Sequence, residues 1–270
     1  MFVNYLEKIV ARKNLSLEEM ETAMNIIMEG RATDSQLAGF LVGLSMKGET
    51  IEEITAAARV MRDKAIAIKS DKLLIDSCGT GGDCKGTFNI STTVALLMAA
   101  AGLNVAKHGN RSVSSKSGSA DLLEALGINI NLAPEQAEQC LDEIGIAFLF
   151  APYFHKAMKY AAGPRRELGL RTIFNILGPL TNPARTKYQI LGVYDPELVY
   201  PLAAVLKNLG VESAMVVHGA GGIDEFSLAG ENKVAYLRNG DIEEFYIGPE
   251  EVGLQRTGLG ELMGGTADKN

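Results

Sequence analysis

A glycine-rich loop between an apolar strand and a helix constrains this chain more than any other stretch. Residues 73–75 predict a short buried strand, residues 76–87 a loop with four glycines, and residues 93–101 a helix. Glycine lets a backbone approach a ligand closely, and a helix N-terminus presents free N–H groups and a partial positive charge. The stretch therefore predicts a site for a phosphate or a similar anion.

The glycine spacing is neither that of a P-loop nor that of a dinucleotide-binding turn, so the motif alone is weak. A tight turn with no ligand is an equally good interpretation of such a loop. Polar side chains nearby favour a ligand. Asn89, Ser91 and Thr92 lie where the helix is expected to begin, residues 107–111 (Lys-His-Gly-Asn-Arg) follow the next strand, and residues 112–119 form a second Gly/Ser-rich turn.

Charge narrows the class of ligand. The net charge of −7 disfavours a protein that neutralises many phosphates of a nucleic acid. Positive charge is instead concentrated near the loop in sequence, at Lys85, Lys107, Arg111 and Lys116. This pattern suits a small polyanionic ligand.

The cysteines and the apolar runs indicate the compartment. The three cysteines lack zinc or redox spacing, which favours a reduced, cytoplasmic setting; they are Cys78, Cys84 and Cys140. No apolar run approaches the ~18 residues that a membrane span needs. We therefore expect neither a membrane nor a nucleic acid as a partner.

Residues 1–69 are predicted to be helical throughout. Three pairs have the spacing of a capping box, in which two side chains satisfy the free N–H groups at a helix start: Ser16 with Glu19, Thr33 with Gln36, and Thr50 with Glu53. Apolar residues follow each pair at helical spacing. This region is expected to be a small all-helical domain.

From residue 73 onward, strands alternate with helices, which predicts an α/β domain with a mostly parallel sheet over residues 70–270. Strands are predicted at 73–75, 103–106, 146–150, 188–193 and 214–217, helices at 119–126, 134–144 and 197–209, and a hairpin at 234–237 and 243–247. Since the last twenty residues show no convincing element, we expect the natural domain to extend beyond residue 270.

The stretch 161–183 interrupts this alternation. It carries Arg165 and an amphipathic helix predicted at 171–177, which Gly178-Pro179 is expected to end. We expect part of it, about 163–183, to return toward the helical domain and to place Arg165 in the cleft between the two domains.

Two adjacent carboxylates, Asp224 and Glu225, follow a predicted strand end, where ligands collect in open α/β sheets. They could hold Mg²⁺, which bridges carboxylates and phosphate oxygens. A solvated acidic loop is an equally good interpretation of the pair alone. Zinc is disfavoured because the three histidines lie far apart, and no nucleophile elbow occurs. The residues favour Mg²⁺-assisted transfer from a phosphorylated substrate without a covalent nucleophile.

Three blocks together carry a resemblance to a known family: the loop 79–92, the segment 107–121, and residues 171–175 with 178–183. They resemble the anthranilate phosphoribosyltransferases of tryptophan biosynthesis. The resemblance implies a helical domain that forms a homodimer, a larger α/β domain of the nucleoside phosphorylase/phosphoribosyltransferase type, and a site at the hinge. The implied reaction moves phosphoribose from phosphoribosyl pyrophosphate to anthranilate and releases pyrophosphate.

The resemblance also implies roles for individual residues. Arg165 would pair with the anthranilate carboxylate, together with Gly79 and Asn110, while Ser91, Asp224 and Glu225 would hold Mg²⁺. The implied contacts to phosphoribosyl pyrophosphate are Gly79, Gly82, Asp83, Thr87, Asn89, Ile90, Ser91, Thr92, Lys107, His108, Gly109, Asn110, Arg111, Ser112, Val113, Ser114, Ser115 and Ser119.

The chain departs from the usual family pattern at Lys156 and at Gly163-Pro164, and family members extend some seventy residues further. Two other interpretations remain open. One is a pyrimidine-nucleoside phosphorylase-like enzyme of the same architecture. The other is a non-catalytic relative that binds a ligand or nucleic acid.

Overall fold

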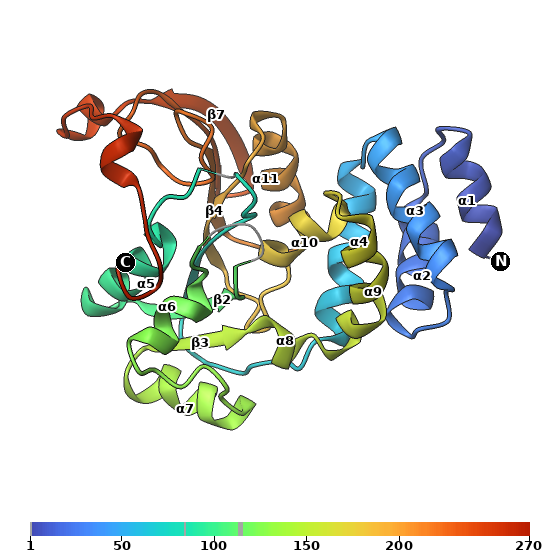
Figure 1. Cartoon of the computed structure of the whole chain (residues 1–270), viewed down its shortest axis with the longest axis horizontal. Coiled ribbons are helices and arrows are strands. Elements are labelled where there is room, and N and C mark those ends of the chain that lie inside the picture. Colours follow the sequence, from blue (N-terminus) through green and yellow to red (C-terminus); the bar gives the residue numbers. More distant parts are fainter. Residues whose placement is uncertain (1, 84, 113–115) are drawn as a thin grey trace.

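The computed structural model describes residues 2–83, 85–112 and 116–270. Figure 1 shows a bundle of helices that contains the N-terminus beside a larger part built around a sheet. The first four helices of the bundle are α1 (Phe2–Val10), α2 (Leu17–Met28), α3 (Asp34–Lys47) and α4 (Ile51–Lys64). The prediction of an all-helical N-terminal region is confirmed as far as Lys64, but residues 65–69, which were included in it, are not helical.

The three predicted capping boxes begin α2, α3 and α4. In each, the cap hydroxyl accepts a hydrogen bond from the N–H of the third helical residue, whose own side chain accepts from the backbone of the cap residue. Each cap stabilises its helix by about 1 kcal/mol. The first turns of three helices are thus specified locally.

A buried ion pair joins two of these helices. Glu53 is fully buried and accepts from the Lys47 Nζ at 2.8 Å, while Lys47 itself is almost fully buried. The Glu53 carboxylate also accepts from the backbone N–H groups of Leu15 and Thr50, at 2.9 and 2.8 Å. One carboxylate therefore connects the start of α4 to the end of α3 and to the segment before α2.

Seven strands of the described chain form one sheet in the order β3-β2-β1-β4-β5-β6-β7. The first five are parallel, as predicted, and β6 and β7 are antiparallel. Their bounds are β1 (Leu74–Gly79), β2 (Asn104–Gly109), β3 (Ile146–Phe150), β4 (Tyr188–Gly192), β5 (Ser213–His218), β6 (Asn232–Arg238) and β7 (Asp241–Ile247). The predicted hairpin turns at Asn239 and Gly240, whose φ angles of 54° and 82° are those of a type I′ turn.

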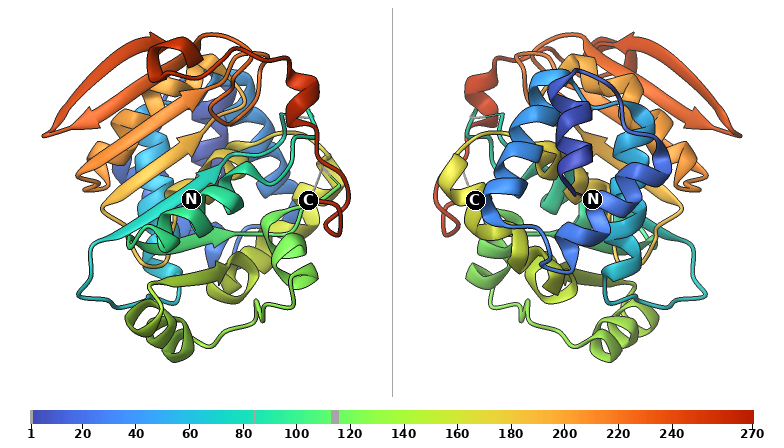
Figure 2. Two further views of the ribbon diagram at one scale, coloured as in Figure 1. Left: turned by 90° about the vertical axis from the view of Figure 1, so that its left-hand side faces the viewer. Right: turned by 90° about the vertical axis from the view of Figure 1, so that its right-hand side faces the viewer.

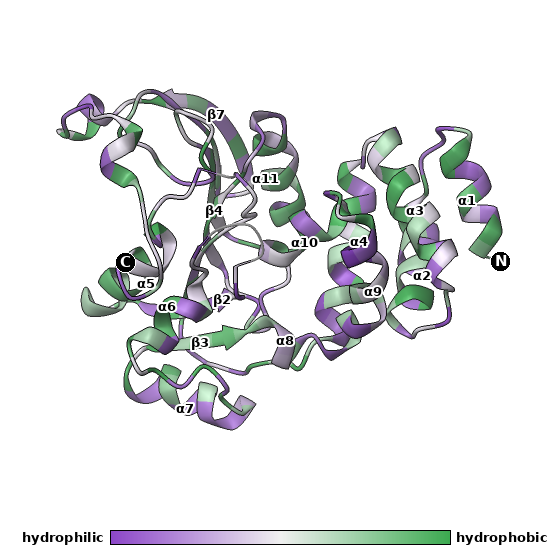
Figure 3. Cartoon of the chain, in the orientation of Figure 1, coloured by the Kyte–Doolittle hydropathy of each residue, from purple (hydrophilic) through white to green (hydrophobic). Residues whose placement is uncertain are grey.

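Helices cover both faces of the sheet. The helix α5 (Ile90–Ala100) packs on β1 and β2, α7 (Pro134–Glu143) packs on β2 and β3, and α11 (Val199–Asn208) packs on β5 and β6. Hydrophobic and hydrophilic residues alternate along α7, whereas β3 is mostly hydrophobic (Figure 3). The remaining helical elements on this part are α6 (Ser119–Ala125), α8 (Ala151–Phe154) and the short 3₁₀ turns Lys156–Met158, Pro196–Leu198, Pro249–Val252 and Leu259–Leu262.

Two helices from the middle of the chain pack against the N-terminal bundle. They are α9 (Lys159–Leu168), which contacts α2 and α3, and α10 (Ile173–Leu180), which contacts α3 and α4. Figure 2 shows the bundle standing against one side of the sheet part. One continuous hydrophobic cluster runs from the bundle through α10 to α11 and β4.

Several predicted bounds are wrong. The strand predicted at 73–75 is β1 and runs to Gly79, because Asp76, Ser77 and Cys78 pair with β4 rather than belonging to the loop. The helix predicted at 93–101 begins at Ile90, since the Thr93 N–H already donates to the Asn89 carbonyl at 3.0 Å.

Two other helices also differ from prediction. The helix expected at 171–177 is α10, and Gly178-Pro179 lies inside its last turn rather than ending it. The helix expected at 197–209 begins as the 3₁₀ turn Pro196–Leu198 and becomes α-helical only at Val199.

Replacing Glu53 tests the buried ion pair. We expect Glu53→Gln to lower the free energy of unfolding by about 3–5 kcal/mol, because it leaves the Lys47 ammonium buried without a counter-charge. The neighbouring Glu52, exposed in the same first turn, provides the matched control Glu52→Gln. Urea unfolding of both variants measures the difference, and equal stabilities would contradict this role of Glu53.

Candidate active site

The carboxyl ends of the parallel strands bring the predicted site residues to one edge of the sheet. Gly79, Gly109 and Gly192 are the last residues of β1, β2 and β4, and β5 ends at His218. The loops that follow these strands lie at this edge (Figure 1). This is the edge at which open α/β sheets bind ligands.

The loop after β5 places the carboxylates of Asp224 and Glu225 against the glycine-rich loop. The Gly81 N–H donates to the Asp224 Oδ2 at 2.6 Å, and the Ser91 N–H, in the first turn of α5, donates to the Glu225 Oε1 at 3.1 Å. Residues far apart in sequence are thus joined by two hydrogen bonds. The structure brings together Asp224, Glu225 and the loop, as the sequence predicted.

The glycines at the ends of β1 and β4 allow the loop that carries Asp224 to approach these strands closely. A Cβ on Gly192 would lie 1.5 Å from the Asp224 carbonyl oxygen, and a Cβ on Gly79 would lie 2.4 Å from the Asp224 Oδ2. No side chain fits at either position without displacing the acidic loop. Gly192 is therefore required by the close approach of the Asp224 backbone, and Gly79 by that of the Asp224 carboxylate.

Burial raises the pKa values of both carboxylates. Burial and the neighbouring Asp83 raise the pKa of Asp224 to about 6, and burial together with Asp224 raises the pKa of Glu225 to about 8. Like charges held close in a buried site disfavour ionisation. A cation placed between them would reverse this effect.

Lys107 supplies positive charge from the end of β2. Its side chain is 3% exposed, and its Nζ donates to the Ser77 carbonyl at 2.6 Å and to the Ser91 Oγ at 3.4 Å. Next to it, the Thr92 hydroxyl donates to the Ser119 Oγ at 3.0 Å. An ammonium group, hydroxyls and a helix N-terminus therefore converge, which suits a phosphate group.

The second Gly/Ser-rich turn is held by Asp121, which accepts from the N–H groups of Ser112 and Gly118 at 3.1 and 2.8 Å. Arg111 bonds to Asp121 and Glu124 beside this turn, so two carboxylates already compensate its charge. Lys107 is thus the predicted cation that lies buried in the site. The predicted contacts Val113, Ser114 and Ser115, and Cys84, lie outside the described residues.

A buried polar network lies beneath the site, and sequence analysis missed it. The Asn182 amide donates to the Asp76 Oδ2 at 2.8 Å and to the Ala106 carbonyl at 2.7 Å, while the His108 N–H donates to the Asp76 Oδ1 at 3.3 Å. In the sequence, Asn182 was noted only as part of the block 178–183 that carries the family resemblance, and no role was predicted for it. The signal that it carried was a polar residue in a run of apolar ones.

Two buried histidines stand beside this network. The ring centroids of His108 and His155 are 5.1 Å apart, and within the described residues the Nε2 of each lacks a hydrogen-bond partner. Burial lowers the pKa of both, that of His155 to about 4. Both rings are therefore neutral near pH 7. His155 was not among the predicted site residues.

Arg165 lies on α9, half-buried, with its guanidinium 5.2 Å from the ring centroid of Phe174. Burial lowers its pKa from the ordinary arginine value. A different arginine from the same segment contacts the glycine-rich loop: Arg171, whose Nη2 donates to the Gly82 carbonyl. Arg171 was not among the predicted site residues.

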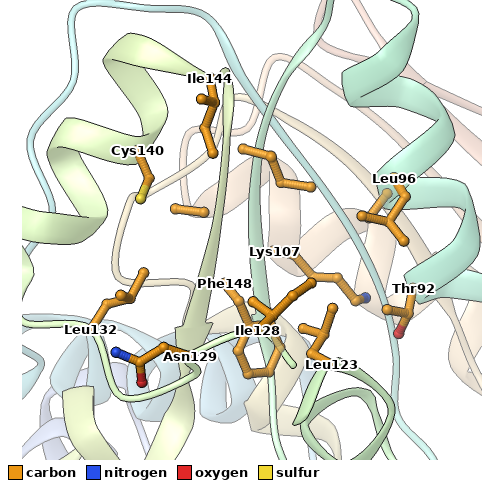
Figure 4. A pocket seen from close by; sticks show the side chains of 13 residues that line it. Thr92, Leu96, Lys107, Leu123, Ile128, Asn129, Leu132, Cys140, Ile144 and Phe148 are labelled. Atoms are coloured by element: carbon orange, nitrogen blue, oxygen red, sulfur yellow. The ribbon is translucent and has the colours of Figure 1, made fainter. Parts of the chain in front are cut away.

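An apolar cavity of about 340 Å³ lies behind the site, between the helices α5, α6 and α7 and the strands β2 and β3 (Figure 4). Thr92 and Lys107 line it at one side, and nearly all other lining atoms are apolar, among them those of Leu123, Ile128 and Phe148. A polyanion would lose its hydration there without gaining partners. The cavity is therefore distinct from the phosphate site.

Comparisons with known proteins agree over the whole chain. Residues 3–65 match the helical bundle domain of the glycosyl transferase family, and residues 71–270 match its a/b domain. The chain is 66% identical to the anthranilate phosphoribosyltransferase of Petrotoga mobilis, over all of this chain and 79% of that protein.

Solved structures give the same likeness. The crystal structure of anthranilate phosphoribosyltransferase from Thermus thermophilus is 46% identical with a TM-score of 0.92, over 98% of this chain and 79% of that chain. The enzyme from Saccharomyces cerevisiae in complex with PRPP and Mg is 27% identical with a TM-score of 0.89, over 99% of this chain and 78% of that chain.

Adding a methyl group at Gly192 tests how closely the loop that carries Asp224 packs against the end of β4. We expect Gly192→Ala to lower the free energy of unfolding by about 2 kcal/mol or more, since the Asp224 backbone must move. Gly163→Ala is the matched control: Gly163 lies in α9 with open space around its Cβ position, so alanine should be neutral or stabilising. Thermal unfolding measures both, and an unaffected Gly192→Ala would show that the loop is not tightly seated.

Proposed function

The chain belongs to the anthranilate phosphoribosyltransferases of the glycosyl transferase family, and we propose that its glycine-rich loop, acidic pair and Arg165 divide the work of one two-substrate transfer. The chain transfers phosphoribose from 5-phosphoribosyl 1-pyrophosphate to anthranilate, a step of tryptophan biosynthesis. The bond from C1 to the pyrophosphate oxygen breaks, the amine nitrogen bonds to C1, and the amine gives up a proton.

The phosphoribosyl pyrophosphate site that we propose is the edge formed by residues 79–92 and 107–119. The start of α5 and the buried Lys107 support this, because they offer N–H donors and positive charge at one place. Thr92 and Ser119 add hydroxyls beside them. These groups would bind the sugar phosphate and the leaving pyrophosphate.

Asp224 and Glu225, with the Ser91 hydroxyl, would hold Mg²⁺. The donor set fits, since Mg²⁺ takes hard oxygen ligands and commonly uses one or two carboxylates together with substrate phosphates. The Asp83 Oδ2 nearby is buried and has no hydrogen-bond partner within the described residues. When bound, Mg²⁺ would offset charge on the departing pyrophosphate.

The described residues contain no group of three or more His, Cys, Asp and Glu side chains arranged to hold a metal ion. Coordination by the acidic pair would therefore be completed by phosphate oxygens and water. The protein's own part is to keep Asp224 and Glu225 aligned through the Gly81 and Ser91 N–H groups.

Arg165 would bind the anthranilate carboxylate through a two-pronged hydrogen bond, and Gly79 and Asn110 would also contact anthranilate. Its partial burial supports this role, because a charge-assisted bond is stronger away from water. We assign no covalent nucleophile. An aligned aromatic amine attacks C1 as that carbon loses its leaving group.

We further propose a homodimer formed by the helical bundle, and a cytoplasmic location. Exposed apolar side chains on the bundle support the dimer: Val3 on α1, Val10 on α1 at 80% exposure, and Met46 on α3 at 70%. The described cysteines, Cys78 and Cys140, are free thiols, as expected in a reducing compartment. No helix within the described residues is long and apolar enough to cross a membrane.

This proposal rests mainly on one observation: Asp224 and Glu225 are hydrogen-bonded to the N–H groups of the glycine-rich loop and of the start of α5. A direct assay follows the fluorescence of anthranilate after phosphoribosyl pyrophosphate and Mg²⁺ are added. The fluorescence should fall only when both are present. A folded protein that leaves the fluorescence unchanged would overturn the transferase function.

Replacing Arg165 tests the acceptor site. We expect Arg165→Ala to raise the KM for anthranilate by roughly 10- to 150-fold, the equivalent of losing a charge-assisted hydrogen bond, with little change in the KM for phosphoribosyl pyrophosphate. Arg166→Ala, an exposed arginine in the same helix, is the control. An equal loss for both substrates would make Arg165 a structural residue.

The dependence of the Mg²⁺ requirement on pH tests the metal site. Protons compete with Mg²⁺ for carboxylates whose pKa values are raised to about 6 and about 8, so the Mg²⁺ concentration for half-maximal activity should rise as pH falls from 9 to 6. Glu225→Gln should need more Mg²⁺ at every pH but show a weaker dependence between pH 7 and 9. Comparing the variant with the wild type cancels titration of the substrate, and identical pH profiles would refute the role of Glu225.

A further inference from the structure

The segment between α9 and α10 contacts the glycine-rich loop through Arg171. Its Nη2 donates to the Gly82 carbonyl, and its guanidinium carbon lies 4.1 Å from the ring centroid of Tyr194. Tyr194 is tied to the same loop, because its N–H donates to the Thr80 Oγ1 at 3.2 Å. The guanidinium is thus held between the loop after β1 and the segment after β4.

The bond to the Gly82 carbonyl determines how the loop presents its backbone. Gly81 and Gly82 have φ angles of 67° and 77°, a region that favours glycine, so this part of the loop has many accessible conformations when unbound. A trans peptide is planar, with its N–H opposite its carbonyl. Fixing the Gly82 carbonyl toward Arg171 therefore points the Asp83 N–H away from it.

The charge of Arg171 is also uncompensated. The described residues contain no carboxylate within ion-pair distance of its guanidinium, in contrast to Arg111, which bonds to Asp121 and Glu124. Arg171 is exposed at the loop, and a Cβ on Gly82 would lie 3.6 Å from its Nε. A positive charge is thus fixed beside the peptide between Gly82 and Asp83, one residue after Gly81, whose N–H donates to Asp224.

We propose that Arg171 is a positioning residue for the pyrophosphate donor: it fixes the Gly82 peptide so that the loop meets the pyrophosphate already ordered. This inference rests on the proposed function. It divides the segment's work between two arginines six residues apart, Arg165 for the acceptor and Arg171 for the donor loop. Tyr194 acts through Arg171 by stacking on its guanidinium.

The test compares Arg171→Gln with Arg238→Gln in the complete protein. Arg238 is exposed at the end of β6, in register with Ser213 at the opposite end of β5 from the site, so its replacement removes the same charge elsewhere. We expect Arg171→Gln to raise the KM for phosphoribosyl pyrophosphate about 10-fold. The KM for anthranilate at saturating donor and the melting temperature should change little, the reverse of the Arg165→Ala pattern.

Two further variants separate position from charge. Arg171→Lys keeps the charge but loses the flat, stacked geometry, so it should recover only part of the donor KM. Tyr194→Leu should raise the donor KM in the same direction, and less than additively when combined with Arg171→Gln.

Full recovery by Arg171→Lys would show that charge alone suffices, and equal KM changes for both substrates would show a general structural role. Either result, or an unchanged donor KM in Arg171→Gln, would overturn this inference. An inactive wild-type protein would instead count against the proposed function, which keeps the two failures distinguishable.

Discussion

The site depends on the close packing of one loop, which carries Asp224 and Glu225, against the ends of two parallel strands. Asp224 reaches the glycine-rich loop only because Gly79 and Gly192 leave room for its backbone and carboxylate, and the Gly81 N–H then bonds to that carboxylate. This close approach concentrates negative charge in a buried place and raises the pKa values of Asp224 and Glu225. Such a charge is costly alone and favourable beside a cation. Under the proposed function, a Mg²⁺ ion bound here together with phosphate would offset this charge.

Positive charge is also placed locally at the site, although the chain is acidic as a whole. Lys107 is buried beside the start of α5, whereas Arg111 is neutralised by Asp121 and Glu124. The field that a polyanion meets is set by such nearby groups, because charges beyond the Debye length of about 10 Å are screened. A net charge of −7 is thus compatible with a phosphate site.

Much of the fold could be predicted, since its signals are local. Capping boxes, the Asn239-Gly240 turn and the alternation of strands and helices each depend on neighbouring residues, and the structure contains them. The ends of elements were less predictable. Asp76 and Ser77 look like loop residues, yet they belong to β1 because the buried Asn182 and Lys107 satisfy their polar atoms. Those partners lie 106 and 30 residues away.

The proximity of several candidate site residues was predictable for a similar reason, whereas their roles stay predictions. Five of them lie near the carboxyl end of a parallel strand, in the loop after one or in the first turn of a helix, so topology alone brings them to one edge of the sheet: Gly79, Ser91, Lys107, Asp224 and Glu225. Arg171 and His155 could not be found this way, because their positions depend on how the segment between β3 and β4 folds back on the bundle. No local spacing encodes that packing.

A crystal structure with pyrophosphate and Mn²⁺ would show whether the acidic pair binds the metal, because the anomalous signal of Mn²⁺ locates the metal independently of the protein. We expect a peak in direct contact with carboxylate oxygens of Asp224 and Glu225, with pyrophosphate oxygens completing the coordination beside the start of α5. A metal bound only by pyrophosphate, or a pyrophosphate away from residues 79–92, would contradict it.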